Sequence, residues 1–396
     1  MNDWLMDWTL SPAILNGLLS VLQSAQLGLL SLLHAIGLAP DVHGQPAWPF
    51  SSRIAGEMLL RDAGHARSVL ASAACLALVL LALLVSIFWR RARFYLWGLA
   101  LAALLLAPWP QASLLLTSAT PTSFHSSQSG FTAEGIVRGQ QLYQQACMRC
   151  HGADGRGEGP DAASLAMWPP TLNGSLLWKR LEGELFWHVR HGMQGRDGKP
   201  TMPGLGQQLN DAQVWELLDF LQAQAAGEML KESGAWLNPV RLPDGPVRCQ
   251  RSSRATARSL AGQRVRVAVA LAGAPLLADD PRLVSLQLSL PSAPNAASAA
   301  ADPECEMQGA AVATSLSLIL GVPVGQLPGY QVIVDRQGWM RAMGKPGKGG
   351  WSEDDLICRS EIKSGPGPSA PVQDGLDGLI RRMDAEPVRL LRGGFP

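Results

Sequence analysis

Two long apolar runs near the amino terminus constrain the fold of this chain more than any other feature. Val69–Trp89 contains no charged residue, and Phe94–Leu116 repeats the pattern. A helix of about 20 residues spans the roughly 30 Å hydrocarbon core of a bilayer. The short segment between the runs, Arg90–Arg93, carries three arginines, which the positive-inside rule places in the cytoplasm. The sequence therefore predicts a transmembrane hairpin that delivers the chain after Thr117 to the outer side of the membrane.

A third apolar segment, Pro12–Leu38, precedes the hairpin and admits two interpretations. It contains no Asp, Glu, Lys or Arg, but it is interrupted by Asn16, Gln23, Gln26 and His34. As a transmembrane helix it would give three crossings, which we expect; as an interfacial or re-entrant helix it would leave the amino terminus outside. Asp3 and Asp7 stand where a signal peptide would carry positive charge, so we expect that this segment is not a signal peptide. We predict a lipid-embedded anchor over residues 1–118 with two or three transmembrane helices, followed by a linker over 119–131.

Two stretches flanking these runs carry a family resemblance. "PAWPFSSRI" (Pro46–Ile54) and "ATPTSFHSSQSGFTAEGI" (Ala119–Ile136) resemble the last membrane segments and exit linker of copper-resistance D-type membrane proteins fused to a cytochrome. The resemblance covers only a remnant of that larger helical fold. His34, His43 and His65 are scattered rather than clustered, so copper transport is not inferred.

The stretch "CMRCHG" (Cys147–Gly152) carries the chemistry of the chain. A zinc site would need a second pair of ligands, and no other cysteines form such a pair. A thioredoxin-type dithiol would follow a strand, whereas Ala133–Ala146 has the apolar period of a helix. Covalent haem c explains every residue, because two thiols add to the porphyrin vinyl groups and the adjoining His151 reaches the iron. The motif therefore predicts one haem c, with its iron, bound to Cys147, Cys150 and His151 outside the cytoplasm.

The surrounding residues, Thr132–Gly227, resemble the monohaem class I cytochrome c family. The matching stretches are "GIVRGQQLYQQACMRCHG" (Gly135–Gly152), "GADGRGEGP" (Gly152–Pro160), "WPPTL" (Trp168–Leu172) and "TMPGLGQQLNDAQVWELLDFLQ" (Thr201–Gln222). The resemblance implies an all-α cytochrome domain over 132–230. It also implies that Pro170 offers its carbonyl to the second imidazole nitrogen of His151, and that Met202 is the sixth iron ligand.

Three other residues remain alternatives for the sixth ligand. Met193, His188 and His191 lie at suitable distances along the chain. We expect Met202, because it precedes Pro203 and the final helix as the thioether ligand of the family does. Thioether ligation raises the reduction potential relative to bis-histidine ligation, which suits electron transfer.

From Asn238 onward the pattern changes to strands and loops, and histidine is absent. The segments that carry this prediction are a strand at Gly262–Leu271, a helix at Ala311–Gly321, a hairpin at Leu327–Gly344 and a terminal helix at Gly375–Val388. Their order resembles the thioredoxin-like fold, in which a proline such as Pro328 precedes the hairpin. The resemblance implies an α/β domain over 238–396.

This carboxy-terminal segment lacks the residues for thiol or copper chemistry. It contains no Cys-x-x-Cys, so dithiol exchange is not supported, and no histidine for a copper chaperone site. Cys249, Cys305 and Cys358 remain, and two of them are expected to pair in an oxidising compartment. The sequence does not fix which two. We predict a docking or structural domain of degenerate thioredoxin-like fold.

The sequence as a whole predicts a multi-domain protein with transmembrane α-helices, a class I cytochrome c domain and a carboxy-terminal α/β domain. Its predicted function is electron transfer at the periplasmic face of a bacterial inner membrane, without catalysis of its own. The partners would be redox proteins of the respiratory chain or an oxidoreductase. A haem-linked thiol oxidoreductase and a copper-handling membrane protein are the alternatives. A net charge of +1 gives no basic stripe for nucleic acid.

Overall fold

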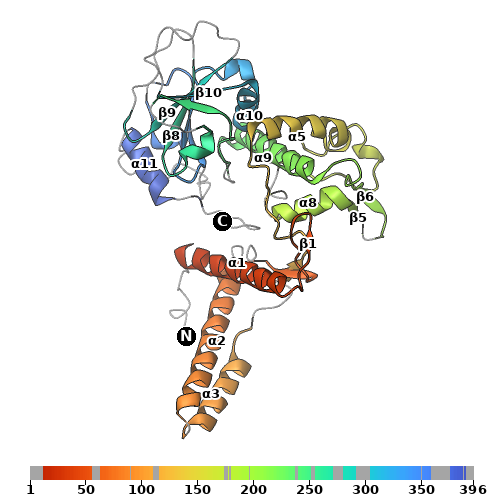
Figure 1. The fold of residues 1–396 in the computed structure, drawn as a ribbon, viewed down its shortest axis with the longest axis vertical. Helices are drawn as coiled ribbons and strands as arrows, with labels where there is room; N and C mark the ends of the chain where they lie inside the picture. Colours follow the sequence, from red (N-terminus) through yellow and green to blue (C-terminus); the bar gives the residue numbers. More distant parts are fainter. Residues whose placement is uncertain are drawn as a thin grey trace, which may run out of the picture. The chain divides into compact units, whose positions relative to one another are not determined.

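A computed structural model provides the structure of the protein. It describes residues 12–388 except 56–62, 90, 110–115, 174–176, 178–179, 196, 237–239, 251–254, 271–279, 291–303, 349, 358–374 and 387. The chain forms two compact units, one before Ser126 and one from Ser126 onward (Figure 1).

The described residues of the first unit form helices and short strands. They are α1 (Pro12–Ala35), β1 (Asp41–Val42), β2 (Gln45–Pro46), β3 (Ser52–Ile54), α2 (Ala63–Phe88), α3 (Arg93–Leu106) and β4 (Leu116–Ser118). β1 pairs with β2, and β3 pairs antiparallel with β4. The β3–β4 pair joins the chain just before α2 to the chain just after α3.

The predicted apolar hairpin is present as α2 and α3, which pack through Val79, Ala82 and Ala100. Within α2, residues Ser68–Phe88 are long and apolar enough to cross a membrane. α3 ends at Leu106 and is therefore shorter than the predicted run Phe94–Leu116. Pro108 follows, and a proline disfavours helical backbone in the residue before it. Ala107 accordingly has an extended ψ of 137°.

The second unit begins with the helical domain that contains the Cys-x-x-Cys-His motif. Its elements are α5 (Ala133–Ala146), α6 (Met148–His151), the 3-10 turn η3 (Ala162–Ser164), α8 (Glu182–His191), β5 (Met193–Gln194), β6 (Pro200–Met202) and α9 (Asp211–Ser233). Side chains cap the two long helices: Thr132 accepts from the Gly135 amide, and Asn210 forms a capping box with Gln213. α5 and α9 cross in close contact at Gly139, where a Cβ would lie 2.1 Å from the Glu216 carbonyl oxygen.

A six-stranded mixed sheet follows, in the order β12-β11-β8-β9-β10-β7. The strands are β7 (Val247–Cys249), β8 (Val265–Val269), β9 (Val284–Ser289), β10 (Cys305–Gln308), β11 (Gln331–Val334) and β12 (Met340–Gly344). β8, β9 and β10 run parallel, and the other neighbours pair antiparallel. The strand expected at Gly262–Leu271 is β8, and the hairpin expected at Leu327–Gly344 is β11–β12.

Short helices accompany this sheet. They are η4 (Ala257–Leu260), α10 (Ala310–Leu320), η6 (Val324–Gln326), η7 (Glu353–Asp355) and α11 (Leu376–Ala385). α10 packs against α9 and α5 of the helical domain (Figure 1). At that contact a Cβ on Gly227 would lie 1.9 Å from the Leu318 carbonyl oxygen. Trp236 is buried and donates its indole N–H to the Ala226 carbonyl at 3.0 Å. One apolar core therefore runs through both the helical domain and the sheet-containing region.

A disulfide joins Cys249 of β7 to Cys305 of β10. The two residues lie directly opposite each other on antiparallel strands. The structure thus resolves the pairing that the sequence left open. Cys358 lies outside the described residues.

Candidate functional site

The two motif cysteines lie on one turn of helix at the end of α5. The Cys147 carbonyl accepts hydrogen bonds from the Cys150 amide at 3.1 Å and from the His151 amide at 2.9 Å. Residues three apart on a helical turn share one face, so the two thiols lie side by side. Neither is in a disulfide, and both are half-buried. The turn therefore offers two adjacent thiols and a following imidazole.

The protonation of Cys147 distinguishes this pair from a redox dithiol. Burial, and secondarily the neighbouring Cys150, raises the pKa of the Cys147 thiol to about 12. Dithiol oxidoreductases depend on a thiol whose pKa is lowered, since the thiolate is the nucleophile. The pair is thus poorly suited to thiol exchange.

His151 follows directly and is partly buried. Burial lowers its pKa, and the Pro170 backbone opposes that effect by favouring the protonated ring. The Nδ1 atom is buried, yet no described residue gives it a hydrogen bond of ordinary geometry. The Pro170 carbonyl is therefore a close neighbour of the ring rather than a well-formed acceptor. A neutral imidazole is the form that ligates a metal.

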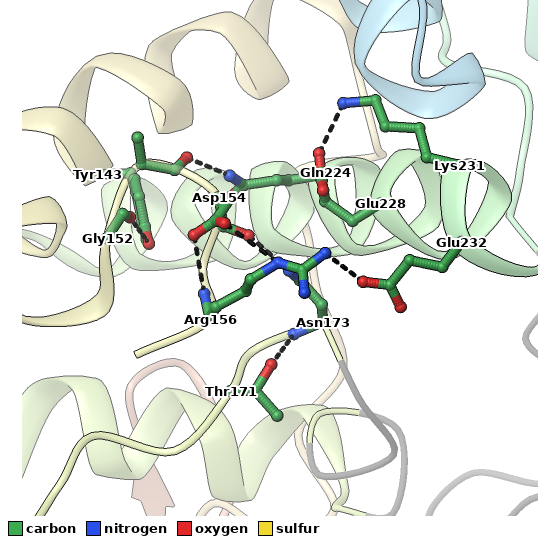
Figure 2. Close-up of polar contacts among 11 residues, drawn as sticks. Tyr143, Gly152, Asp154, Arg156, Thr171, Asn173, Gln224, Glu228, Lys231 and Glu232 are labelled. Atoms are coloured by element: carbon green, nitrogen blue, oxygen red, sulfur yellow. Dashed lines mark hydrogen bonds and ion pairs between the residues drawn. The ribbon is translucent and has the colours of Figure 1, made fainter. Parts of the chain in front are cut away.

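The glycine-rich loop after the motif is fixed to α5, to α9 and to Asn173, as Figure 2 shows. The Tyr143 hydroxyl donates to the Gly152 carbonyl at 2.6 Å. The Gln224 amide of α9 donates to the Ala153 carbonyl at 2.6 Å, and the Asn173 amide donates to the Asp154 carbonyl at 2.5 Å. These bonds hold the loop, and with it the turn that carries His151.

Two further features of the loop bring it to the segment around Pro170. Gly157 has a φ of 85°, and a Cβ there would lie 2.1 Å from the Pro169 carbonyl oxygen. Only glycine permits both that backbone conformation and that approach. Arg156 forms ion pairs with Asp154 and with Glu232 of α9 (Figure 2). All three side chains are about half exposed, so the ion pairs orient the loop more than they stabilise it.

The β5–β6 hairpin presents the two candidate methionines. Met193 lies directly opposite Met202. Met202 is partly buried and packs against the main core, whereas Met193 is 37% exposed. The inward position therefore belongs to Met202.

The candidate histidines of α8 have other contacts. His188 Nε2 lies 3.0 Å from Arg180 Nη1, and burial together with that guanidinium lowers the pKa of His188. Arg180 can only donate, so its N–H occupies the lone pair that a metal would need. His191 is exposed and its ring lies against Trp187, with centroids 3.8 Å apart.

Several apolar side chains of the helical domain are only partly buried. Those packed against the core while remaining partly exposed include Leu142, Cys147, Met148, Leu172, Leu185 and Met202. In the same core Phe186 stacks on Trp215, with ring centroids 4.6 Å apart. The two free thiols and the neutral imidazole that follows them are the groups that a covalently attached haem requires.

One unusual residue of the domain was not anticipated from the sequence. Asp219 is buried on α9 and accepts a hydrogen bond from the Ser129 hydroxyl. Burial raises the pKa of Asp219 to about 7, Glu182 and Glu216 add to the rise, and Ser129 and the Phe131 backbone oppose it. Its signal in the sequence is an acidic residue inside the apolar run "LLDFL" (Leu217–Leu221).

These features are typical of a c-type cytochrome domain: a helical fold with two adjacent free thiols and a partly buried histidine directly after them. Residues 134–221 match the family model described as cytochrome C oxidase, cbb3-type, subunit III. A solved structure of the reducing HAO-like protein complex of Kuenenia stuttgartiensis is similar at 19% identity and a TM-score of 0.22, over 32% of this chain and 59% of that one. No curated protein matches the chain. The chain therefore contains a cytochrome c domain, which supports haem-based electron transfer.

Proposed function

We propose that this protein is a membrane-bound electron carrier with one covalently attached haem c. The observation that carries the proposal is the α5–α6 turn, on which two free thiols lie side by side immediately before His151. The turn lies within the part of the chain that matches the cytochrome family.

In this proposal each residue has a defined task. Cys147 and Cys150 form thioether bonds to the porphyrin, His151 and Met202 ligate the iron, and the Pro170 carbonyl orients the imidazole. Bound haem supplies a one-electron couple. The surrounding protein buries the porphyrin and excludes water from it, and the Met202 sulfur raises the reduction potential by favouring the reduced iron.

The first unit supports the membrane location. α2 is long and apolar enough to span a bilayer, and α3 packs against it as the second arm of the hairpin. With the arginine turn in the cytoplasm, the cytochrome domain lies on the periplasmic side of a bacterial inner membrane. Its partners there are redox proteins of the respiratory chain or an oxidoreductase.

The sheet-containing region is proposed to be a degenerate thioredoxin-like domain with a structural role. β8 lies between the parallel strand β9 and the antiparallel hairpin β11–β12, an arrangement that supports this assignment. Cys249 and Cys305 are bonded to each other, and Cys305 is buried, which disfavours a thiol oxidoreductase. Within the described ranges, no group of three or more His, Cys, Asp or Glu side chains could hold a metal ion, so copper handling gains no support.

Metal analysis and a redox titration of the purified full-length protein test this function. We expect one iron and no copper per chain, and an absorption spectrum of a c-type haem that is reversibly reduced in a one-electron step. Copper in stoichiometric amount, or a spectrum that does not respond to reductant, would contradict the proposal.

A further inference from the structure

Helix α1 carries an exposed apolar stripe along one side. Val21 and Leu32 are 65% and 59% exposed, and Leu29 also lies on this surface. At 3.6 residues per turn these three fall within an arc of about 80°. Ser20, Ser24 and Ser31 lie on a different, polar side of the helix. Such a stripe of exposed apolar side chains needs an apolar environment.

The opposite side of α1 rests on the short strands of the same unit. The Gln26 amide forms two hydrogen bonds with the Ile54 backbone: it accepts from the N–H at 2.8 Å and donates to the carbonyl at 3.4 Å. Leu30 is buried with Ala39 and Trp48. α1 is therefore held to β3 at the level of Gln26.

The position of β3 along the hairpin is fixed by its partners. β3 precedes α2 and pairs with β4, which follows α3. The Ser72 hydroxyl of α2 also donates to the Pro108 carbonyl beyond α3 at 3.0 Å. These contacts put β3 at the end of the hairpin that is remote from the arginine turn.

A membrane-spanning α1 conflicts with these contacts. If Ala35 stood at the outer surface, Gln26 would lie nine residues and about 14 Å deeper, and β3 would be drawn into hydrocarbon with it. Non-helical backbone is not tolerated there when it faces lipid. If Gln26 instead stood at the surface, Pro12–Gln26 would reach only about 21 Å, short of a core of about 30 Å. α3 is no longer than this, but the uncharged run to which it belongs continues to Leu116.

We propose that α1 is an interfacial helix that lies in the outer surface of the membrane with Val21, Leu29 and Leu32 in the lipid. The chain then crosses the bilayer twice, and its amino terminus lies on the same side as the cytochrome domain. In Figure 1, α1 runs crosswise to α2 and α3. α1 carries no Lys or Arg, so its binding derives from apolar burial rather than from attraction to anionic lipid. The inference rests on the proposed membrane hairpin.

A protease-accessible epitope inserted after Met1 of the full-length protein tests the topology. In intact spheroplasts, added protease should remove the epitope, whereas inverted vesicles should protect it. The reverse pattern would show three crossings and overturn the inference while leaving the membrane anchor standing. Extraction of the whole protein by alkaline carbonate would instead overturn the anchor itself, and the inference with it.

Photoactivatable phospholipids test the lipid contact directly. A probe with its reactive group near the headgroup should label the Val21–Leu32 peptide, and a probe at the chain end should label it several-fold less. Leu32→Glu should reduce the headgroup-level labelling several-fold, whereas Ser31→Glu, on the polar side, should not. Stronger labelling by the chain-end probe, or labelling that is equal in the two variants, would contradict an interfacial α1.

Discussion

The folded protein disfavours the charged form of the Asp219 carboxyl group. It is buried on α9, and its pKa rises from 3.8 to about 7, chiefly through desolvation. The folded state therefore holds this proton more tightly than the unfolded chain does. The resulting stability is fully present below the unfolded pKa and is lost as the pH rises to about 7. Linkage sets a maximal slope of about 1.4 kcal/mol per pH unit for one proton.

Asp219→Asn should remove this dependence, because the amide keeps the shape of the protonated acid without its titration. As the pH rises from about 4 to about 7, the wild type should lose unfolding free energy that the variant keeps. The variant should therefore become more stable relative to the wild type. Denaturant titrations at several pH values measure it. Asp197→Asn, at an exposed position, is the matched control and should follow the wild-type profile. Parallel profiles for wild type and Asp219→Asn would refute the assignment.

The proposed iron ligand is tested by a pair of methionine variants on one hairpin. Met202→Ala should abolish the weak charge-transfer band that a thioether–iron bond gives the oxidised protein, and should lower the reduction potential. Met193→Ala should preserve both, since Met193 lies opposite but is exposed. Absorption spectra and potentiometry provide the measurement. Loss of the band in Met193→Ala alone would reverse the assignment.

At the scale of single elements, the disulfide between β7 and β10 closes a loop with a sequence separation of 56 residues. Replacing both Cys249 and Cys305 with Ala should lower the unfolding free energy by about 2–4 kcal/mol. The haem spectrum and the reduction potential should remain unchanged, because the bond is assigned a structural role. Denaturant unfolding and potentiometry test both statements. A loss of electron transfer to a redox partner at unchanged stability would favour the thiol oxidoreductase instead.

The elements that the sequence predicts well are those whose signals are local. The periodic apolar positions of α5 and the turn of the β11–β12 hairpin both depend on neighbours along the chain. The early end of α3 also has a local cause, Pro108. The sequence nevertheless predicts a longer helix, because the apolar run continues beyond this proline. The Cys249–Cys305 pairing depends on the order of distant strands, which no local pattern encodes.

At the scale of the whole molecule, the cytochrome domain and the sheet-containing region are joined by more than a linker. Helix α10 lies against α9 and α5, and one apolar core includes residues of both parts. The sequence predicts each part separately, but it does not predict their packing. The reason for a glycine at position 227 is visible only in the fold, where the Leu318 carbonyl lies beside it. The sequence also does not predict the environment of Asp219, because its hydrogen-bond partner Ser129 lies 90 residues away along the chain.

Gly227→Ala tests whether this contact couples the two parts. The added Cβ would meet the Leu318 carbonyl oxygen at 1.9 Å, and such overpacking costs about 1–3 kcal/mol. We expect unfolding followed by the haem and unfolding followed by far-ultraviolet circular dichroism to coincide in the wild type and to separate in the variant. Gly325→Ala, where a Cβ meets nothing within 4 Å, should behave as the wild type. Coincident transitions at unchanged midpoint in Gly227→Ala would contradict the coupling.

The central claim, that Cys147 and Cys150 bind haem covalently, is tested most directly by a haem-stained denaturing gel. The full-length protein should be produced in bacteria that attach haem c, and the variant should carry Cys147→Ala with Cys150→Ala. We predict that the wild type keeps its stain after denaturation, as does the Cys249→Ala, Cys305→Ala control. The motif variant should show a protein band without stain, because both thioether bonds are lost. Haem that stays attached to this variant through denaturation would contradict the account.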